Sequence, residues 1–192
     1  MTSICLIRHG ETNWNAAGRI QGKTDIPLNE KGIEQAENCG ASLHPSDYDV
    51  LISSPLKRAK NTAEIINKYL NLPILEIKEF QERSFGDAEG LTIEERKLRF
   101  PDGQYPNQEE REAFSQRVMG AIEEVKRRFP DKRVLVVAHG AVINQILSIL
   151  SNGEIGSGKT KLMNTCISNI HFHEEQWCIK NYNQIDHLAK IV

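Results

Sequence analysis

The stretch CLIRHGET, residues 5–12, decides the fold that we expect for this chain. The apolar run at residues 4–7 is typical of a short buried strand, and it ends at a corner formed by Arg8, His9 and Gly10. Polar residues at the carboxyl end of such a strand face the crevice where α/β proteins bind ligands, and a glycine there lets a ligand approach the backbone. The corner therefore predicts an imidazole, held on a rigid element beside a fixed cation, that can attack an anion.

The second half of the chain repeats this arrangement. Residues 134–138 form an apolar, β-branched run that ends at His139 and Gly140, and residues 141–150 then have the pattern of a helix. Two units of strand, histidine, glycine and turn can place their histidines side by side above one sheet. The pair is therefore a stronger indication of a functional site than either histidine alone.

Strands and helices are expected to alternate along the rest of the chain. Asn29 is suited to cap a helix that runs to about Leu43, with Ile33 on its apolar side. Ser54 is suited to cap a helix that starts at Pro55. Further strands are expected at residues 50–52 and 73–77, a long helix at 109–129, and a hairpin at 166–172 and 177–182.

Arg58 is a second candidate for binding an anion. It falls in the first turn of the helix that is expected to run to about Leu70. A cation at this end of a helix is locally unfavourable because the helix dipole is positive there. The position makes sense if an anion binds to both the helix end and the guanidinium. The alternative is an ordinary surface arginine between Lys57 and Lys60.

The length of 192 residues suits one α/β domain. No repeat or linker divides the chain, so we expect a single domain over residues 1–192. A polar stretch at about 83–113 interrupts the pattern of strands and helices. We expect it to form a small cap-like excursion over the crevice.

The composition argues against several classes of protein. The net charge of −2 provides no basic field for nucleic acid, and no apolar run approaches the roughly 20 residues that span a bilayer. No signal peptide is recognisable. The four cysteines have no CxxC spacing and are expected to be reduced thiols. We therefore expect a cytoplasmic protein that binds neither nucleic acid nor membrane.

Residues 153–160, GEIGSGKT, match the nucleotide-binding pattern GxxxxGK[ST] letter for letter. A true P-loop follows a strand and opens a helix. Here residues 142–150 belong to the helix after His139, and too few residues separate the match from the strand near Cys166. We therefore expect no nucleotide site, and no role for Lys159 in the chemistry.

Taken together, the motifs resemble the signature of the histidine phosphatase superfamily, in its phosphoglycerate mutase-like branch. The resemblance begins at residues 6–12, with Trp14 and Asn15 behind them, and ends at residues 137–140. The matching pieces between them follow the family order: Gln21–Gly22, Pro27–Leu28, Ser54–Leu56, Arg58–Ala59, Thr62–Ala63, Glu82–Arg83, Gly86 and Glu89–Gly90.

This resemblance implies a three-layer α/β/α sandwich with a mostly parallel central sheet. It implies that His9 is phosphorylated during turnover and that Glu82 donates and accepts the proton. Side chains with positive charge or hydrogen-bonding groups would surround the phosphoryl group: Arg8, Arg58, His139, Asn15 and Gln21, with Gly22 beside them. Because arginine and histidine supply the positive charge, the resemblance implies no metal and no cofactor.

Only the family pattern selects Glu82 as the acid. On the sequence alone, three neighbouring carboxylates compete with it: Glu79, Asp87 and Glu89.

Within the family, the chain is most similar to the small broad-specificity phosphatases. Mutases carry longer insertions, a tyrosine where Phe85 stands, and a paired arginine that has no clear counterpart here. We expect a phosphomonoester hydrolase acting on small phosphorylated metabolites. The alternatives are a phosphoglycerate mutase, a phosphate-binding regulatory protein without turnover and, last, a P-loop protein. The sequence indicates no oligomeric state.

Overall fold

The computed structural model describes residues 1–189 of the chain. At its centre is a six-stranded sheet with the strand order β3-β2-β4-β1-β5-β6. The strands are β1 (Ser3–Arg8), β2 (Val50–Ser53), β3 (Ile74–Glu76), β4 (Arg133–Ala138), β5 (Ile167–His173) and β6 (Gln176–Gln184). The first four are mutually parallel, and β5 and β6 add an antiparallel hairpin at one edge.

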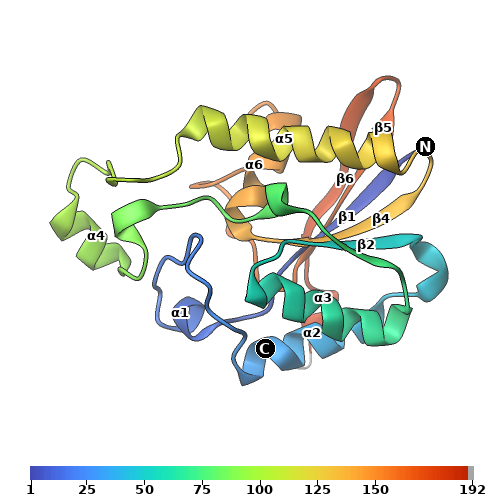
Figure 1. Ribbon diagram of the computed structural model, residues 1–192, viewed down its shortest axis with the longest axis horizontal. Helices are drawn as coiled ribbons and strands as arrows, with labels where there is room; N and C mark the ends of the chain where they lie inside the picture. The colour runs from blue at the N-terminus through green and yellow to red at the C-terminus, as the bar shows by residue number, and fades with distance from the viewer. Residues whose placement is uncertain (190–192) are drawn as a thin grey trace.

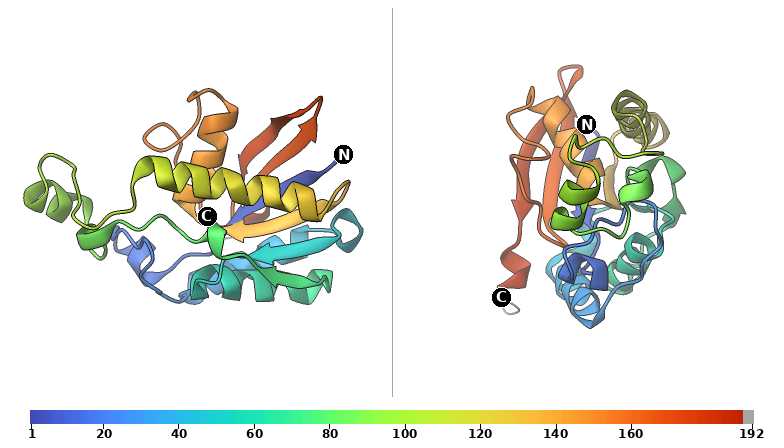
Figure 2. Two further views of the ribbon diagram at one scale, coloured as in Figure 1. Left: turned by 45° about the horizontal axis from the view of Figure 1, so that its top comes forward. Right: turned by 90° about the vertical axis from the view of Figure 1, so that its left-hand side faces the viewer.

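Helices cover both faces of this sheet, as Figure 1 shows. On one face lie α2 (Glu30–Ser42) and α3 (Lys57–Leu70), and on the other lie α5 (Arg111–Arg128) and α6 (Gly140–Leu150). The short helices α1 (Asn13–Ala16) and α4 (Ile93–Arg99) lie at one end of the molecule, beyond the carboxyl end of β1 (Figure 2). The prediction of a three-layer α/β/α sandwich is confirmed.

Side chains of the central strands alternate between two hydrophobic cores. In β1, Ile4 and Leu6 pack in the core that includes α5 and α6, whereas Cys5 and Ile7 pack in the core that includes α2 and α3. A strand buried on both faces is apolar at every position. This double burial explains why residues 4–7 and 134–138 are continuous apolar runs.

Two details of the helices differ from expectation. α3 begins at Lys57 rather than Pro55, and no side chain caps it. The Ser54 hydroxyl instead shares a hydrogen bond with His139, whose Nε2 lies 2.7 Å away. Ile33 does not lie on a buried side of α2, because it is 41% exposed. The buried side of α2 is instead made mainly of small residues: Gly32, Ala36, Cys39 and Gly40.

Two other stretches connect the main elements of the fold. The excursion at about 83–113 contains a 3-10 turn (Gly86–Ala88) and α4. Residues 153–160 lie in a loop with α6 before it and β5 after it, throughout a stretch that the structure describes in full. The context that a nucleotide cradle requires is therefore missing. Among residues 1–189, no helix is long and apolar enough to cross a membrane.

We predict that Gly32→Ala destabilises the protein. A Cβ at this position would lie 2.1 Å from the Glu11 carbonyl oxygen, so α2 or the loop after β1 would have to move. Such overpacking typically costs about 1–3 kcal/mol, which urea unfolding can measure. The matched control is Gly120→Ala in α5, where a Cβ would meet no atom within 4 Å. This variant should gain about 0.5–1 kcal/mol. Equal effects of the two changes would contradict the close contact.

Candidate active site

The register of β1 against β4 brings the two predicted histidines together. The strands are parallel, with Arg8 opposite Ala138, so the residue after each strand lies at the same edge of the sheet. His9 N–H donates to the Ala138 carbonyl at 3.0 Å. The ring centroids of His9 and His139 are 5.2 Å apart, with 55° between the ring planes. Two strands from opposite halves of the chain thus create the paired imidazoles.

Hydrogen bonds fix the ring of His9 and its protonation. Its Nδ1 lies 2.7 Å from the Gly10 carbonyl oxygen, which can only accept, so Nδ1 carries the proton and Nε2 keeps its lone pair. Gly10 N–H in turn donates to Thr62 Oγ1 at 3.0 Å. The Thr62 hydroxyl donates to the Arg58 carbonyl at 2.7 Å. The His9 corner is thereby attached to α3.

Two arginines carry positive charge beside His9. Arg58 is 1% exposed, and its guanidinium donates to the carbonyls of Gly22 at 2.6 Å and Thr24 at 2.9 Å. Arg8 donates to the Leu162 carbonyl at 2.5 Å. Within residues 1–189, neither arginine has a carboxylate within ion-pair distance, and the Nε of each is buried without a partner. A buried cation such as Arg58 is costly without a counter-charge, and Arg8 is partly buried beside it, so this arrangement favours the binding of an anion.

Burial and these cations keep both imidazoles neutral. Burial is the main cause that lowers the pKa of His9 well below 6.5, followed by the positive charges of Arg58 and Arg8. The pKa of His139 is lowered well below the same value by burial and then by Arg58. A neutral imidazole can act as a nucleophile, whereas an imidazolium cannot.

Glu82 lines the same cavity as His9, and its pKa is shifted in the opposite direction. Its carboxylate accepts backbone N–H groups from Ala141 at 3.1 Å and from Arg83 at 2.9 Å. Burial raises the pKa of Glu82 above its ordinary value, and these N–H donors and the two arginines offset the rise only in part. A carboxyl group of this kind can hold a proton at a pH where an exposed glutamate has lost it.

The competing acids are placed elsewhere. Glu89 accepts the backbone N–H groups of Lys23 at 3.1 Å, Thr24 at 3.0 Å and Phe85 at 3.0 Å. Asp87 accepts a hydrogen bond from Asn107 at 3.0 Å. Neither these residues nor Glu79 lines the cavity that contains His9. The geometry therefore singles out Glu82 among the four carboxylates.

Most of the residues that the sequence singled out line one cavity of about 280 Å³: Arg8, His9, Asn15, Gln21, Gly22, Arg58 and Glu82. His139 lies behind it, beside His9. Gln21 and Asn15 are held by Thr12, whose hydroxyl donates to Gln21 Oε1 at 2.7 Å and whose N–H donates to Asn15 Oδ1 at 3.1 Å. Gly22 adopts φ +56°, and a Cβ there would collide with the Glu89 carboxylate.

Several residues at the site were not predicted from the sequence. The sequence marks Thr62 only as part of a motif, yet its hydroxyl accepts a hydrogen bond from Gly10 N–H. Asn164 donates to the His9 carbonyl at 3.0 Å from the far end of the chain. Ser157, within the P-loop-like match, also lines the cavity. No local pattern could reveal Asn164 or Ser157, because only the folded chain brings them to His9.

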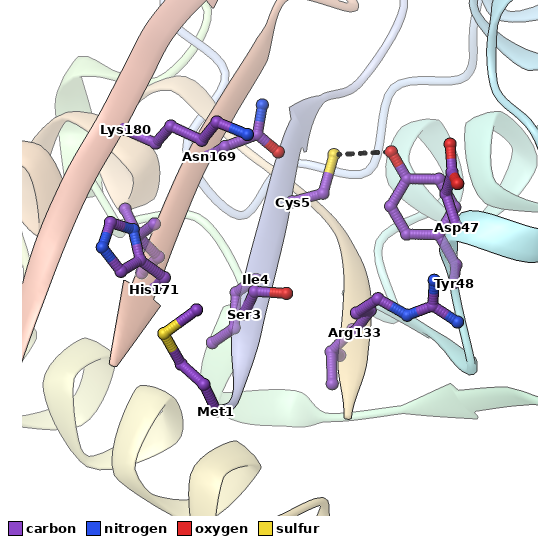
Figure 3. Close-up of a pocket in the computed structure, with 12 residues that line it drawn as sticks. Met1, Ser3, Ile4, Cys5, Asp47, Tyr48, Arg133, Asn169, His171 and Lys180 are labelled. Atoms are coloured by element: carbon purple, nitrogen blue, oxygen red, sulfur yellow. Dashed lines mark hydrogen bonds between the residues drawn. The ribbon is translucent and has the colours of Figure 1, made fainter. Parts of the chain in front are cut away.

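A larger cavity, of about 630 Å³, lies at the opposite end of the sheet (Figure 3). It is lined by the first residues of β1 and β4 together with Tyr48, His171 and Lys180. Tyr48 hydroxyl donates to Cys5 Sγ at 3.7 Å, and burial raises the pKa of that thiol to about 12. A thiol held in this protonated form is a poor nucleophile. The smaller cavity at His9 is therefore the better candidate for chemistry.

Comparisons with known proteins show which family and which relatives the chain resembles. Residues 4–185 match the family described as the histidine phosphatase superfamily (branch 1). The uncharacterized phosphatase PhoE of Bacillus subtilis is 50% identical, over 100% of both chains. A metal-independent phosphoserine phosphatase of Arabidopsis thaliana is 34% identical, over 100% of this chain and 85% of its own. The structure of an Entamoeba histolytica phosphoserine phosphatase in complex with 3-phosphoglyceric acid is 32% identical. It has a TM-score of 0.86 and covers 98% of this chain and 100% of that one.

We predict that Arg58→Gln raises the pKa of His9, because after burial the charge of Arg58 contributes most to lowering it. An NMR titration of the ring protons measures this pKa directly. The control is Lys57→Gln, which removes an exposed charge from the same helical turn and should leave the titration of His9 in place. An identical His9 titration in Arg58→Gln and the unmodified protein would show that burial alone keeps this ring neutral.

Proposed function

The chain belongs to the histidine phosphatase superfamily, and from this premise we propose that it hydrolyses small phosphomonoesters through a phosphohistidine on His9. One observation carries the proposal. A buried imidazole with a free Nε2 stands in a cavity beside two arginines that lack carboxylate partners within residues 1–189. This combination provides a nucleophile and a binding site for the phosphoryl group in one place.

The first half of the reaction transfers the phosphoryl group to the enzyme. Arg8 and Arg58 bind its oxygens, and Nε2 of His9 attacks phosphorus in line with the leaving oxygen. The N–P bond forms as the P–O bond breaks, and Glu82 gives its proton to the leaving oxygen, so that an alcohol departs. Charge on the phosphoryl oxygens meets fixed cations throughout, which is the main source of catalysis in such transfers.

The second half returns the enzyme to its starting state. The ionised Glu82 takes a proton from water while the water oxygen attacks phosphorus. The N–P bond breaks, phosphate leaves and Nε2 regains its lone pair. Protonation of His9 stops the cycle at low pH, and ionisation of Glu82 before the first step stops it at high pH. The lowered pKa of His9 and the raised pKa of Glu82 widen the working range between these limits.

The remaining predicted residues support this cycle. We propose that Asn15 and Gln21 donate their amide N–H groups to the phosphoryl oxygens, since their oxygens already accept hydrogen bonds from Thr12. The Gly22 carbonyl holds the guanidinium of Arg58. We propose that His139, although it is buried beside His9 rather than in the cavity wall, contacts a bound phosphoryl group through its Nδ1, which has no partner within residues 1–189. Because the side chains supply the positive charge, the reaction should proceed in the presence of a chelator.

A phosphoglycerate mutase is the second candidate. Phe85, which lines the cavity, cannot supply the hydroxyl of the tyrosine found at this place in mutases. We therefore favour hydrolysis, in which water takes the phosphoryl group from His9. Steady phosphate release would also rule out a binding protein that lacks turnover. The buried free thiols fit a reducing compartment, and we propose a cytoplasmic location.

We predict that His9→Ala lowers the turnover of p-nitrophenyl phosphate by roughly 10⁴-fold or more, because the nucleophile is lost. Rapid-quench labelling with a radioactive substrate should trap acid-labile phosphate on the unmodified enzyme and none on the variant. His44→Ala, at an exposed histidine, is the control and should label normally. Normal labelling of His9→Ala would disprove the assignment.

We predict that the effect of Glu82→Gln depends on the leaving group. An alkoxide needs a proton in order to leave, whereas a nitrophenolate does not. Single-turnover phosphorylation of His9 should therefore fall by roughly 10²–10⁴-fold with an alkyl phosphate and much less with p-nitrophenyl phosphate. Phosphoenzyme should then accumulate from p-nitrophenyl phosphate, because the base for the second step is missing.

Glu89→Gln is the matched control for this prediction. Its carboxylate binds backbone N–H groups around the cavity rather than the leaving oxygen. The variant should therefore affect both classes of substrate equally. Equal losses for both substrates in Glu82→Gln as well would mean that Glu82 only positions the phosphoryl group.

A further inference from the structure

The P-loop-like segment, residues 153–160, lies against the candidate active site although it is not a nucleotide cradle. Its Ser157 lines the cavity of His9. The next residues, Gly158 to Thr160, line a neighbouring cavity of about 520 Å³. The two cavities share Arg8, Gly140 and Ser157. A ligand held by Arg8 in the first cavity can therefore extend into the second.

Several contacts fix this segment. Gly156, at φ +143°, packs so closely on α6 that a Cβ would lie 2.9 Å from Ser148 Cβ. Asn144 of α6 donates to the Thr160 carbonyl at 3.3 Å. Just beyond the segment, the Leu162 carbonyl accepts from Arg8 at 2.5 Å. The loop is thus held against both α6 and the cation at the end of β1.

The second cavity carries positive charge that no residue of its lining neutralises. Its lining includes Arg8, Lys159 and Lys161 and contains no carboxylate. Within residues 1–189, neither lysine forms an ion pair. Among the described residues, the one hydrogen bond of Lys159 Nζ goes to the Gly153 carbonyl of its own loop. Arg8, which lines both cavities, has a buried Nε donor that finds no partner in the part of the chain that the structure describes.

We propose that this second cavity binds an additional anionic group of the substrate, with Lys159 and Lys161 as its specificity-determining residues. The proposal rests on the phosphatase function and extends it. The preferred substrates are phosphomonoesters whose alcohol part carries a carboxylate or a second phosphate. It also revises the expectation that Lys159 has no role in the chemistry.

The test compares two ligands that differ in one group. 2-Phosphoglycerate carries a carboxylate where glycerol 2-phosphate carries a hydroxymethyl group. Calorimetry on the His9→Ala protein measures the ratio of their dissociation constants without turnover. A second pair, fructose 1,6-bisphosphate against fructose 6-phosphate, shows whether a second phosphate serves as well as a carboxylate.

Lys159→Ala and Lys161→Ala, each in the His9→Ala background, should reduce the preference for the anionic ligand about three- to tenfold, as expected for a partly exposed charge pair. Lys159→Arg should retain it. Lys180→Ala is the matched control, because it removes one exposed lysine at the opposite end of the sheet. Added salt should weaken the preference of the His9→Ala protein.

A preference that survives both alanine changes would overturn the proposal. So would a preference lost in Arg111→Ala alone, because Arg111 lines a different cavity, between Arg83 and Gln145. Failure of the phosphatase function gives a separate result. In that case the unmodified protein releases no phosphate from p-nitrophenyl phosphate, while the binding ratios still decide the role of the lysines.

Discussion

The parallel pairing of β1 with β4 is the constraint on which the rest of the structure depends. Each strand is buried on both faces, so its register is fixed by two cores at once. That register places His9 and His139 at the same edge of the sheet, 5.2 Å apart. A slip of one residue would turn every side chain of a strand to the wrong core and separate the imidazoles. The relative position of the two imidazoles therefore depends on apolar packing in the two cores.

The arginines of the site serve two purposes through one charge. Without an anion, they disfavour protonation of His9 and keep its Nε2 free. With a phosphoryl group present, they bind the oxygens that carry its negative charge. Backbone carbonyls, rather than carboxylates, orient the guanidinium groups within the described part of the chain. A carboxylate in their place would have neutralised the charge that both tasks require.

The sequence was sufficient to predict the sheet, its helical layers and seven of the residues that line the cavity. These predictions depended on continuous apolar runs and on motifs that lie close together in the chain. The sequence did not predict details that depend on tertiary contacts. Serine is a residue type that often caps helices, but the Ser54 hydroxyl forms a hydrogen bond with His139 instead. Ile33 fits a helical apolar pattern, but the neighbouring Gly32 is the residue that packs against Glu11, and Ile33 is exposed.

The position of Glu89 divides the excursion into two parts with different contacts. Its carboxylate joins residues 23–24 to Phe85, and Gly22 leaves room for it. Residues 91–107, which include α4, make none of these contacts, although Ile93 and Arg96 form part of the cavity wall. The end of this outer stretch also holds the turn beside Glu89, because the Pro106 carbonyl accepts the Asp87 N–H at 2.9 Å and Asn107 donates to Asp87 at 3.0 Å. A single carboxylate therefore couples the loop after Gln21 to the inner excursion, while the outer stretch supplies cavity wall only through Ile93 and Arg96.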